Sequence, residues 1–318
     1  MYCSKDMPVR DIPPLSEFES SFVGNLKQVQ VLIRHGARTP YSKFLCWKDY
    51  NLEWKHCNVT DLMMTSLSPH DILHSPWLFR KVYDGSENLL GGDCLTGQLI
   101  PEGYEQETYN GLILSNVYLS GPRKLFPSNL WDDIDKDLVY FRADDDTSGR
   151  VMMSGQLVVQ SMFRSNDTKS IVDFHTGDYS LDQIYPNVKV CPRLDAVAKT
   201  FYSSPEWVEF NNSNAVHTMT SALSHILGEG MWTWFNLMDC FFTTLCTGRE
   251  IPTGGTGAED DPAMTDRLFK ASIQHAADSY SRLLRFNNSE VNGPIDMHIT
   301  FKIFAHCRIT PSVGLVGL

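Results

Sequence analysis

One short segment, residues 34–40, combines the side chains needed to bind and attack a phosphate group. Arg34, His35 and Arg38 occur within five residues of one another. Guanidinium groups bind phosphate oxygens in a bidentate manner, and two flanking positive charges lower the pKa of an imidazole, so His35 is expected to be neutral. A neutral imidazole can act as a covalent nucleophile. The segment therefore predicts a phosphate clamp around a nucleophile. The alternative is a surface loop with a structurally satisfied histidine.

The elements that must carry these side chains can be predicted from the apolar pattern. Three expected strands each end at a basic residue: 29–33 before Arg34 and His35, 138–141 before Arg142, and 297–304 before His306. The first two are almost continuously apolar, as strands buried on both faces of a sheet are. Ligands of open α/β sheets gather beyond the carboxyl ends of the strands. We therefore expect one site assembled from three distant segments.

Helical periodicity separates these strands. The apolar spacing predicts helices over 103–119, 151–163, 232–245 and 266–284. Strands interspersed with helices indicate an α/β fold, with a mixed sheet flanked by helices. Residues 1–26 are expected to form a peripheral leader and residues 27–318 one domain. Within that domain, a smaller and mostly helical region over roughly 160–295 is expected to form a cap.

Composition argues against several classes of partner. The chain has 318 residues, of which 42% are hydrophobic and 20% charged, which is sufficient for a substantial core. Its net charge of −11 argues against a nucleic-acid-binding or anionic-lipid-binding surface. Any bound anion must therefore be held by a local basic cluster. The eight cysteines include no CxxC pair, which argues against a zinc ribbon or a thioredoxin-like redox site.

The cysteines and the glycosylation sequons indicate the secretory pathway. Cysteines spread singly along the chain suit long-range disulfides, with buried free thiols as the alternative. Four Asn-X-Ser/Thr sequons begin at Asn58, Asn166, Asn211 and Asn287. Together these features favour the Golgi lumen, the lysosome or the extracellular space. Residues 1–25 lack the apolar core of a signal peptide, and the apolar run 231–246 is too short to span a bilayer. We therefore expect membrane attachment only through an N-terminal segment missing from this chain.

The segment 34–40, Arg-His-Gly-Ala-Arg-Thr-Pro, resembles the RHGxRxP signature of the histidine acid phosphatases. Other stretches resemble motifs of that family in the same order: 97–106 resembles GQLTxxGxxQ, 141–155 resembles RSTxxxRTxxSG, 191–193 resembles CPR, and 304–306 resembles the start of AHD. The likeness covers residues 28–318. Residues 93–95 and 237–246 look most like the 2-phosphoxylose phosphatase branch.

The resemblance implies a phosphoglycerate-mutase-like fold and the two-step hydrolysis of a phosphomonoester, such as a phosphorylated sugar of a glycan. His35 would attack phosphorus and form a phosphohistidine, which water would then cleave. Arg34, Arg38 and Arg150 would bind the phosphate oxygens, and His306 would donate to one of them, so that fixed donors stabilise the transition state. The resemblance implies no metal and no other cofactor, because this cluster supplies the positive charge.

Arg142 competes with Arg150 for the third arginine position of the clamp. The spacing from Arg142 to Arg150 is two residues longer than the family pattern leads us to expect. We favour Arg150, for which the alternative is a surface charge at a helix N-terminus. For Arg142 the alternative is an ion pair with one of the three aspartates at 144–146.

The sequence departs from the family after the second histidine. Cys307 stands where the family has the aspartate that protonates the leaving group. A thiol has an ordinary pKa of about 8.5, and beside His306 and Arg308 it tends toward the thiolate, so it is a poor acid. General acid catalysis contributes about 10²–10⁴-fold. We therefore expect a weakened enzyme, or alternatively a pseudophosphatase that binds a phosphorylated ligand without turnover. One of the aspartates at 144–146 could replace the lost acid, but an acidic loop facing water is favoured.

The C-terminal end of the chain also differs from the family. The family continues well past the second histidine, whereas this chain ends at Leu318, so we expect a truncation. Residues 312–318 look like the start of the helix that follows this histidine in the family.

Overall fold

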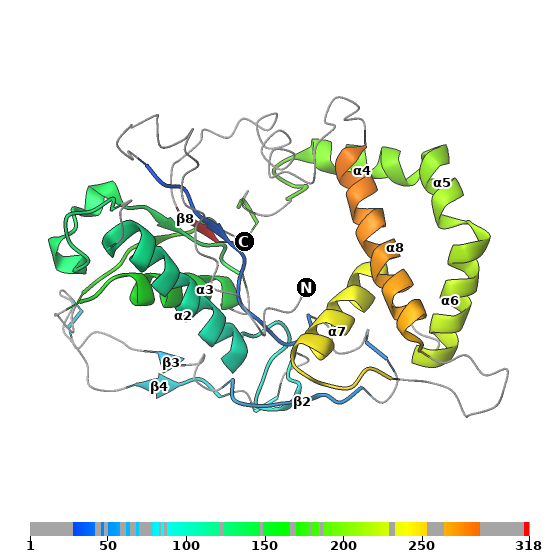
Figure 1. The fold of residues 1–318 in the computed structure, drawn as a ribbon, viewed down its shortest axis with the longest axis horizontal. Helices are drawn as coiled ribbons and strands as arrows, with labels where there is room; N and C mark the ends of the chain where they lie inside the picture. Colours follow the sequence, from blue (N-terminus) through cyan, green and yellow to red (C-terminus); the bar gives the residue numbers. More distant parts are fainter. Residues whose placement is uncertain are drawn as a thin grey trace. The chain divides into compact units, whose positions relative to one another are not determined.

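Two compact units make up the computed structural model of the chain (Figure 1). The first, called the sheet unit below, comprises Met1–Thr39, Leu52–Tyr179 and Ser312–Leu318, and the second, called the helical unit, comprises Pro40–Asn51 and Ser180–Pro311. The structure describes residues 28–41, 46–47, 50–57, 62–63, 68–69, 78–82, 84–85, 88–120, 124–146, 149–165, 170–178, 180–182, 184, 187–228, 233–252, 264–286 and 315–317.

Short parallel strands form the main sheet of the sheet unit. Their order is β1 (Leu32–Ile33), β8 (Leu315–Gly317), β6 (Phe141–Arg142) and β7 (Phe174–His175). The expected α/β class is confirmed, although β1 and β6 are shorter than the apolar runs 29–33 and 138–141. Because the strands are parallel, the residues that follow β1 and the end of β6 lie at the same edge of the sheet.

The strand between β1 and β6 corrects one expectation. Residues 312–318 are expected to begin a helix, but Leu315–Gly317 pairs with both neighbouring strands. Gly314 and Gly317 disfavour a helix, and the backbone groups of β1 and β6 offer hydrogen-bond partners that a strand can use. The expected strand over 297–304 lies outside the described residues.

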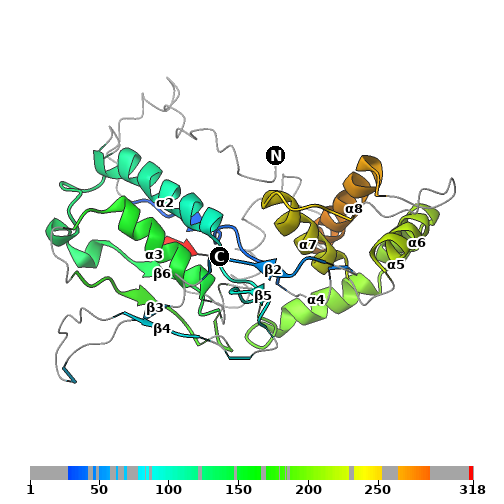
Figure 2. The same cartoon turned by 90° about the horizontal axis from the view of Figure 1, so that it is seen from below.

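Helices α2 (Pro101–Ser115) and α3 (Arg150–Met162) run side by side in both views (Figures 1 and 2). Pro101 opens α2, where its missing N–H would have no helical partner, and a π-helical turn, η3 (Asn116–Ser120), continues it. Apolar side chains of both helices share a buried core with Phe141 of β6 and Phe174 of β7. The periodicity over 103–119 and 151–163 therefore predicts both helices correctly.

The rest of the sheet unit consists of loops and small elements. Strand β2 (Glu53–Trp54) pairs with β5 (Gly91–Gly92), and β3 (Leu62–Met63) pairs with β4 (Phe79–Arg80). Two short 3₁₀ helices, η4 (Trp131–Asp133) and η5 (Lys136–Leu138), precede β6. A disulfide between Cys57 and Cys94 crosslinks the loops next to β2 and β5.

The described part of the helical unit is built from helices, and all but the first of them begin at a polar cap. They are α4 (Pro192–Tyr202), α5 (Pro205–Asn211), α6 (Asn214–Leu227), α7 (Trp234–Cys246) and α8 (Asp266–Arg285). Ser204, Ser213, Thr233 and Thr265 each accept a hydrogen bond from the backbone N–H three residues later, which stabilises a helix start. Leu223, Leu227, Leu237 and Phe241 form the core of this unit.

Several expectations bear on the helical unit. The predicted helices 232–245 and 266–284 are confirmed as α7 and α8. The predicted cap, 160–295, overlaps this unit, but its role as a cover over a clamp stays a prediction. A disulfide joins Cys46 to Cys240 of α7, and no described cysteine is a free thiol. No helix among the described residues is long and apolar enough to cross a membrane.

Candidate active site

The backbone of the loop after β1 packs directly against the start of α2. A Cβ on Gly36 would lie 2.5 Å from the carbonyl oxygen of Gly103, so only glycine allows this approach. The Gly36 N–H donates to Oγ of Ser154 on α3 (3.2 Å), and the Ala37 N–H donates to Oε1 of Gln106 on α2 (2.8 Å). Both helices therefore hold the loop that carries the predicted nucleophile.

Hydrogen bonds fix the tautomer of His35. Its Nδ1 lies 2.8 Å from the Gly36 carbonyl oxygen, which can only accept, so Nδ1 carries the proton. In the neutral ring Nε2 then holds the lone pair, which accepts a hydrogen bond from the Arg38 Nε–H at 3.4 Å. The nitrogen that faces the arginine is therefore the one able to attack an electrophile.

Burial and nearby positive charge together keep the His35 ring neutral. Burial is the largest cause that lowers its pKa to about 3, followed by the charges of Arg38, Arg150 and Arg34, against a smaller opposing effect of the Gly36 carbonyl. The prediction that flanking arginines lower this pKa is confirmed, but the sequence pattern missed the larger contribution of burial. The ring therefore stays neutral even in mildly acidic solution.

The arginines around His35 differ in exposure. Arg34 is exposed, whereas Arg38 is buried and its NH1 donates to the Thr39 carbonyl oxygen at 2.9 Å. Thr39 is in turn tied to the segment before α2, because its N–H donates to the carbonyl oxygen of Gln98 at 3.0 Å. Despite this difference, the charges of Arg34, Arg38 and Arg150 all contribute to the lowered pKa of His35.

Arg150 is the first residue of α3 and forms a buried ion pair. Its NH1 lies 2.9 Å from Oδ2 of Asp146, and the two side chains are 12% and 7% exposed. The same NH1 donates to the Gly97 carbonyl oxygen at 3.4 Å. The alternative of a surface charge therefore does not hold for Arg150. The expectation that the acidic loop faces water is wrong for Asp146, although it holds for its neighbour Asp145. Asp144 also has a buried carboxylate oxygen, so the packing of the folded chain, which the sequence does not show, decides which of the three aspartates are buried.

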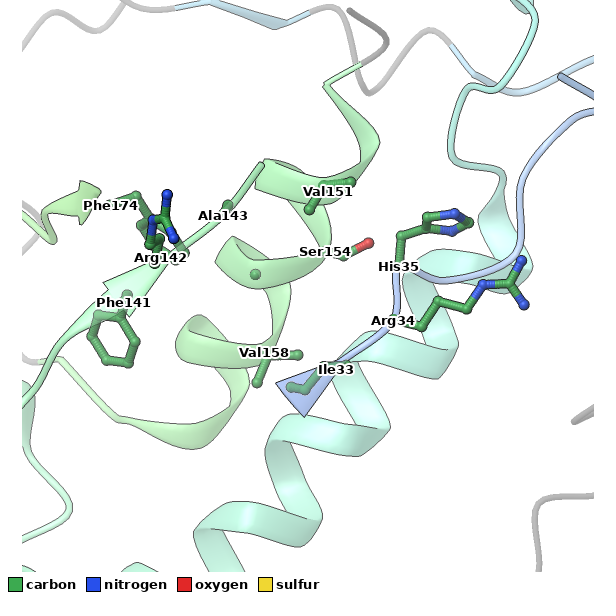
Figure 3. Close-up of a pocket in the computed structure, with 11 residues that line it drawn as sticks. Ile33, Arg34, His35, Phe141, Arg142, Ala143, Val151, Ser154, Val158 and Phe174 are labelled. Atoms are coloured by element: carbon green, nitrogen blue, oxygen red, sulfur yellow. The ribbon is translucent and has the colours of Figure 1, made fainter. Parts of the chain in front are cut away.

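Arg34, His35 and Arg142 also line a small pocket between the sheet and α3 (Figure 3). In this view Arg34 and His35 lie on one side and Arg142 on the other, with Ser154 between them. The floor is apolar: Ile33, Phe141, Val158 and Phe174. Arg150 is one of the charges that lower the pKa of His35. The choice of Arg150 over Arg142 as the third arginine of the clamp stays a prediction.

Two predicted residues lie outside the described part of the chain, and one cluster within it has the spacing of metal ligands. His306 and Cys307 lie outside the described residues, so their roles stay predictions. Among the described residues, the group with metal-ligand spacing is Cys57, Asp93 and Cys94. Its two sulfurs form the disulfide, so they are not the thiolates that bind metal ions.

Three residues that hold the site together were not predicted in that role. Gln106 and Ser154 lie within the motif-like stretches 97–106 and 141–155, which was the available signal for both. Asp146 was considered only as one of the three aspartates that could replace the lost acid or pair with Arg142. Each of the three contacts either the loop around His35 or Arg150.

Comparison with known proteins places these observations in context. The family model described as the histidine phosphatase superfamily (branch 2) matches residues 25–253. The chain is 32% identical over 240 residues to counting factor 60 of Dictyostelium discoideum, covering 73% of this chain and 55% of that protein. It is 30% identical over 176 residues to lysophosphatidic acid phosphatase type 6 of Bos taurus, covering 53% of this chain and 38% of that protein.

Among solved structures, a Hafnia alvei phytase in complex with tartrate is similar with a TM-score of 0.42 and 14% sequence identity, covering 92% of this chain and 71% of the phytase. The chain spans about half the length of counting factor 60 and less of the bovine phosphatase.

Proposed function

The chain belongs to branch 2 of the histidine phosphatase superfamily, and we propose that it hydrolyses phosphomonoesters through a phosphohistidine at His35. The observation that carries this proposal is the state of the His35 ring. It is neutral, its Nδ1 proton is bound by Gly36, and its Nε2 lone pair is next to Arg38. A nucleophile, an orienting group and phosphate-binding donors therefore occur together.

The reaction proceeds in two displacements. The Nε2 lone pair of His35 attacks phosphorus, the bond from phosphorus to the ester oxygen breaks, and the leaving oxygen takes up a proton. Water then attacks the phosphohistidine, releasing inorganic phosphate and the free imidazole. Arg34, Arg38 and Arg150 bind the phosphoryl oxygens, and His306 adds a further donor, so that their charges stabilise the transition state.

Protonation of the leaving group is the step for which this site is expected to be least effective. The family resemblance places Cys307 where an aspartic acid would donate it, and a thiol is the poorer donor in acidic solution. Substrates with good leaving groups are therefore turned over better than alkyl esters. A protein that binds phosphate but does not hydrolyse it is the second candidate function, because the same substitution removes the acid and leaves the arginines in place.

The preferred pH, the substrate and the compartment follow from separate observations. The lowered pKa of His35 keeps the nucleophile active in acid, as an acid phosphatase requires. A phosphorylated sugar of a glycan is the proposed substrate, on the resemblance to the 2-phosphoxylose phosphatase branch. The bovine relative adds lysophosphatidic acid as a second phosphomonoester to test. The disulfides Cys46–Cys240 and Cys57–Cys94 support a compartment of the secretory pathway.

The deciding experiment compares leaving groups at about pH 5, where a neutral His35 and a protonated carboxylic acid can coexist. The full chain is assayed with an aryl phosphate, a sugar phosphate and lysophosphatidic acid. The expected result is turnover of the aryl ester that His35→Ala abolishes and that His217→Ala, a change at an exposed histidine, leaves intact. Comparable turnover of an alkyl ester would show that another group replaces the lost acid. No turnover of any ester by folded protein would refute the enzyme and leave the binding function.

A further inference from the structure

The buried ion pair between Asp146 and Arg150 has no role in the reaction as described so far. Arg150 occupies the first position of α3, after Gly149, which contributes no side-chain cap. A helix N-terminus carries partial positive charge, so a cation there is disfavoured. Burial adds a further cost unless a counter-charge is present. The Asp146 carboxylate, 2.9 Å from Arg150 NH1, supplies that counter-charge.

The backbone ties Asp146 to the helix start. The Gly149 N–H donates to the Asp146 carbonyl oxygen at 3.1 Å. Gly149, the residue before α3, adopts a φ of 68°, a conformation that favours glycine. The carboxylate is therefore held at a fixed place relative to the guanidinium.

A second hydrogen bond fixes the direction of the Arg150 side chain. Its NH1, which pairs with Asp146, also donates to the Gly97 carbonyl oxygen. Gly97 precedes Gln98, whose N–H donates to Oγ1 of Thr39 at 3.0 Å and whose carbonyl oxygen accepts from the Thr39 N–H. Thr39 follows Arg38 directly, so the acceptors of Arg150 are connected to the loop that carries His35. The charge of Arg150 is also one of the causes of the lowered pKa of His35.

We propose that Asp146 is a positioning residue of the phosphate clamp, whose carboxylate orients the Arg150 guanidinium toward a phosphate group on His35. The inference rests on the proposed function, because it assumes that Arg150 binds the phosphoryl oxygens. The role assigned to Asp146 is exerted through Arg150. The opposite possibility is that the carboxylate competes with phosphate for Arg150. In that case, removing the carboxylate would tighten phosphate binding.

The test is a double-mutant cycle with inorganic phosphate as the probe. Binding to the full chain is measured by titration calorimetry for the unaltered protein, Asp146→Ala, Arg150→Ala and the double variant. Asp145→Ala, a change at the exposed neighbouring aspartate, is the matched control. Asp146→Ala is expected to raise the Kd for phosphate about tenfold or more, since a charged hydrogen-bonding partner of the binding group is lost. The double variant is expected to bind no more weakly than Arg150→Ala alone.

Asp146→Asn separates orientation from charge. The amide oxygen can still accept from NH1, so its Kd is expected to lie between those of the unaltered protein and Asp146→Ala. Tighter phosphate binding by Asp146→Ala would show that the Asp146 carboxylate competes with phosphate. If the two single losses of phosphate affinity add up in the double variant, Asp146 acts independently of Arg150. Either result overturns the inference. If the unaltered chain binds no phosphate, the proposed function fails first, and the cycle shows this directly. Circular dichroism of each variant reports whether α3 still forms.

Discussion

Replacing Glu107 with glutamine is expected to stabilise the chain at neutral pH and to leave it unchanged in acid. Glu107 lies on the inner face of α2 and is 2% exposed. Burial raises the pKa of its carboxyl from 4.5 to about 7, and the hydrogen bond from Asn110 Nδ2 (3.0 Å) offsets only part of that effect. The folded chain therefore retains a proton that the unfolded chain releases at a lower pH.

The magnitude and the sign follow from this difference. Between pH 4.5 and about 7 the folded state binds more protons than the unfolded state, so the free energy of unfolding falls as pH rises through that window. At 1.36 kcal/mol per pKa unit, the whole shift corresponds to a cost of roughly 3 kcal/mol above the window. Glutamine has no proton to release, and its amide oxygen can still accept from Asn110.

Urea unfolding followed by circular dichroism at a series of pH values measures the difference between the two proteins. The gain from Glu107→Gln should be near zero below pH 4.5 and grow to roughly 3 kcal/mol at neutral pH. Glu105→Gln, on the exposed face of the same helix, should give no pH-dependent difference. A gain that is the same at every pH, or a loss that grows toward neutral pH, would refute the reasoning.

Three further outcomes are expected. Gly103→Ala places a Cβ against the Ala37 carbonyl oxygen and displaces the loop of His35, so aryl phosphate turnover should fall about tenfold or more while the circular dichroism spectrum is retained. The control Gly85→Ala, whose Cβ meets open space, should have no effect. Equal turnover of the two variants would disprove the contact. The acid limb of the kcat/KM profile should lie near pH 3, because His35 is protonated only below its lowered pKa; a limb near pH 6.5 would mean that the ring is not buried. Burial also lowers the pKa of His275, so its contribution to stability is complete above pH 6.5 and declines as pH falls. The urea midpoint of His275→Phe, followed by tryptophan fluorescence, should therefore change less with acidification than that of the unaltered chain, and equal changes would contradict this.

The arginine–histidine segment could be predicted because its side chains are adjacent in the sequence. Charge proximity alone then predicts the direction in which the pKa of His35 is shifted. The larger effect, burial, depends on contacts with distant residues: Ser154 is 118 positions from Gly36 in the chain. Periodicity identifies α2 and α3, but it does not indicate which of their turns meets the loop after β1.

Polar residues on buried faces were the features that the sequence analysis most often failed to predict. Periodicity assigns a helix face to the core, and it gives no reason to expect a carboxyl such as Glu107 among the buried positions of α2. In the same way, the aspartates at 144–146 form one acidic run in the sequence, and only the folded structure shows that Asp146 pairs with Arg150. The strand at 315–317 was missed because its partners, β1 and β6, are far away in the sequence.

The disulfide between Cys46 and Cys240 has a consequence for the order in which the chain is made. The two cysteines are separated by 194 residues, whereas Cys57 and Cys94 are separated by 37. At about 5–20 residues per second, Cys240 emerges from the ribosome on the order of 10–40 s after Cys46. During that interval Cys57 and Cys94 are the next thiols that Cys46 can meet. Correct pairing therefore requires that Cys46 remain reduced while Cys57 pairs with Cys94, or that an early mispaired bond be exchanged by a thiolate. A segment placed early in the sequence can complete the helical unit only after most of the chain has been synthesised.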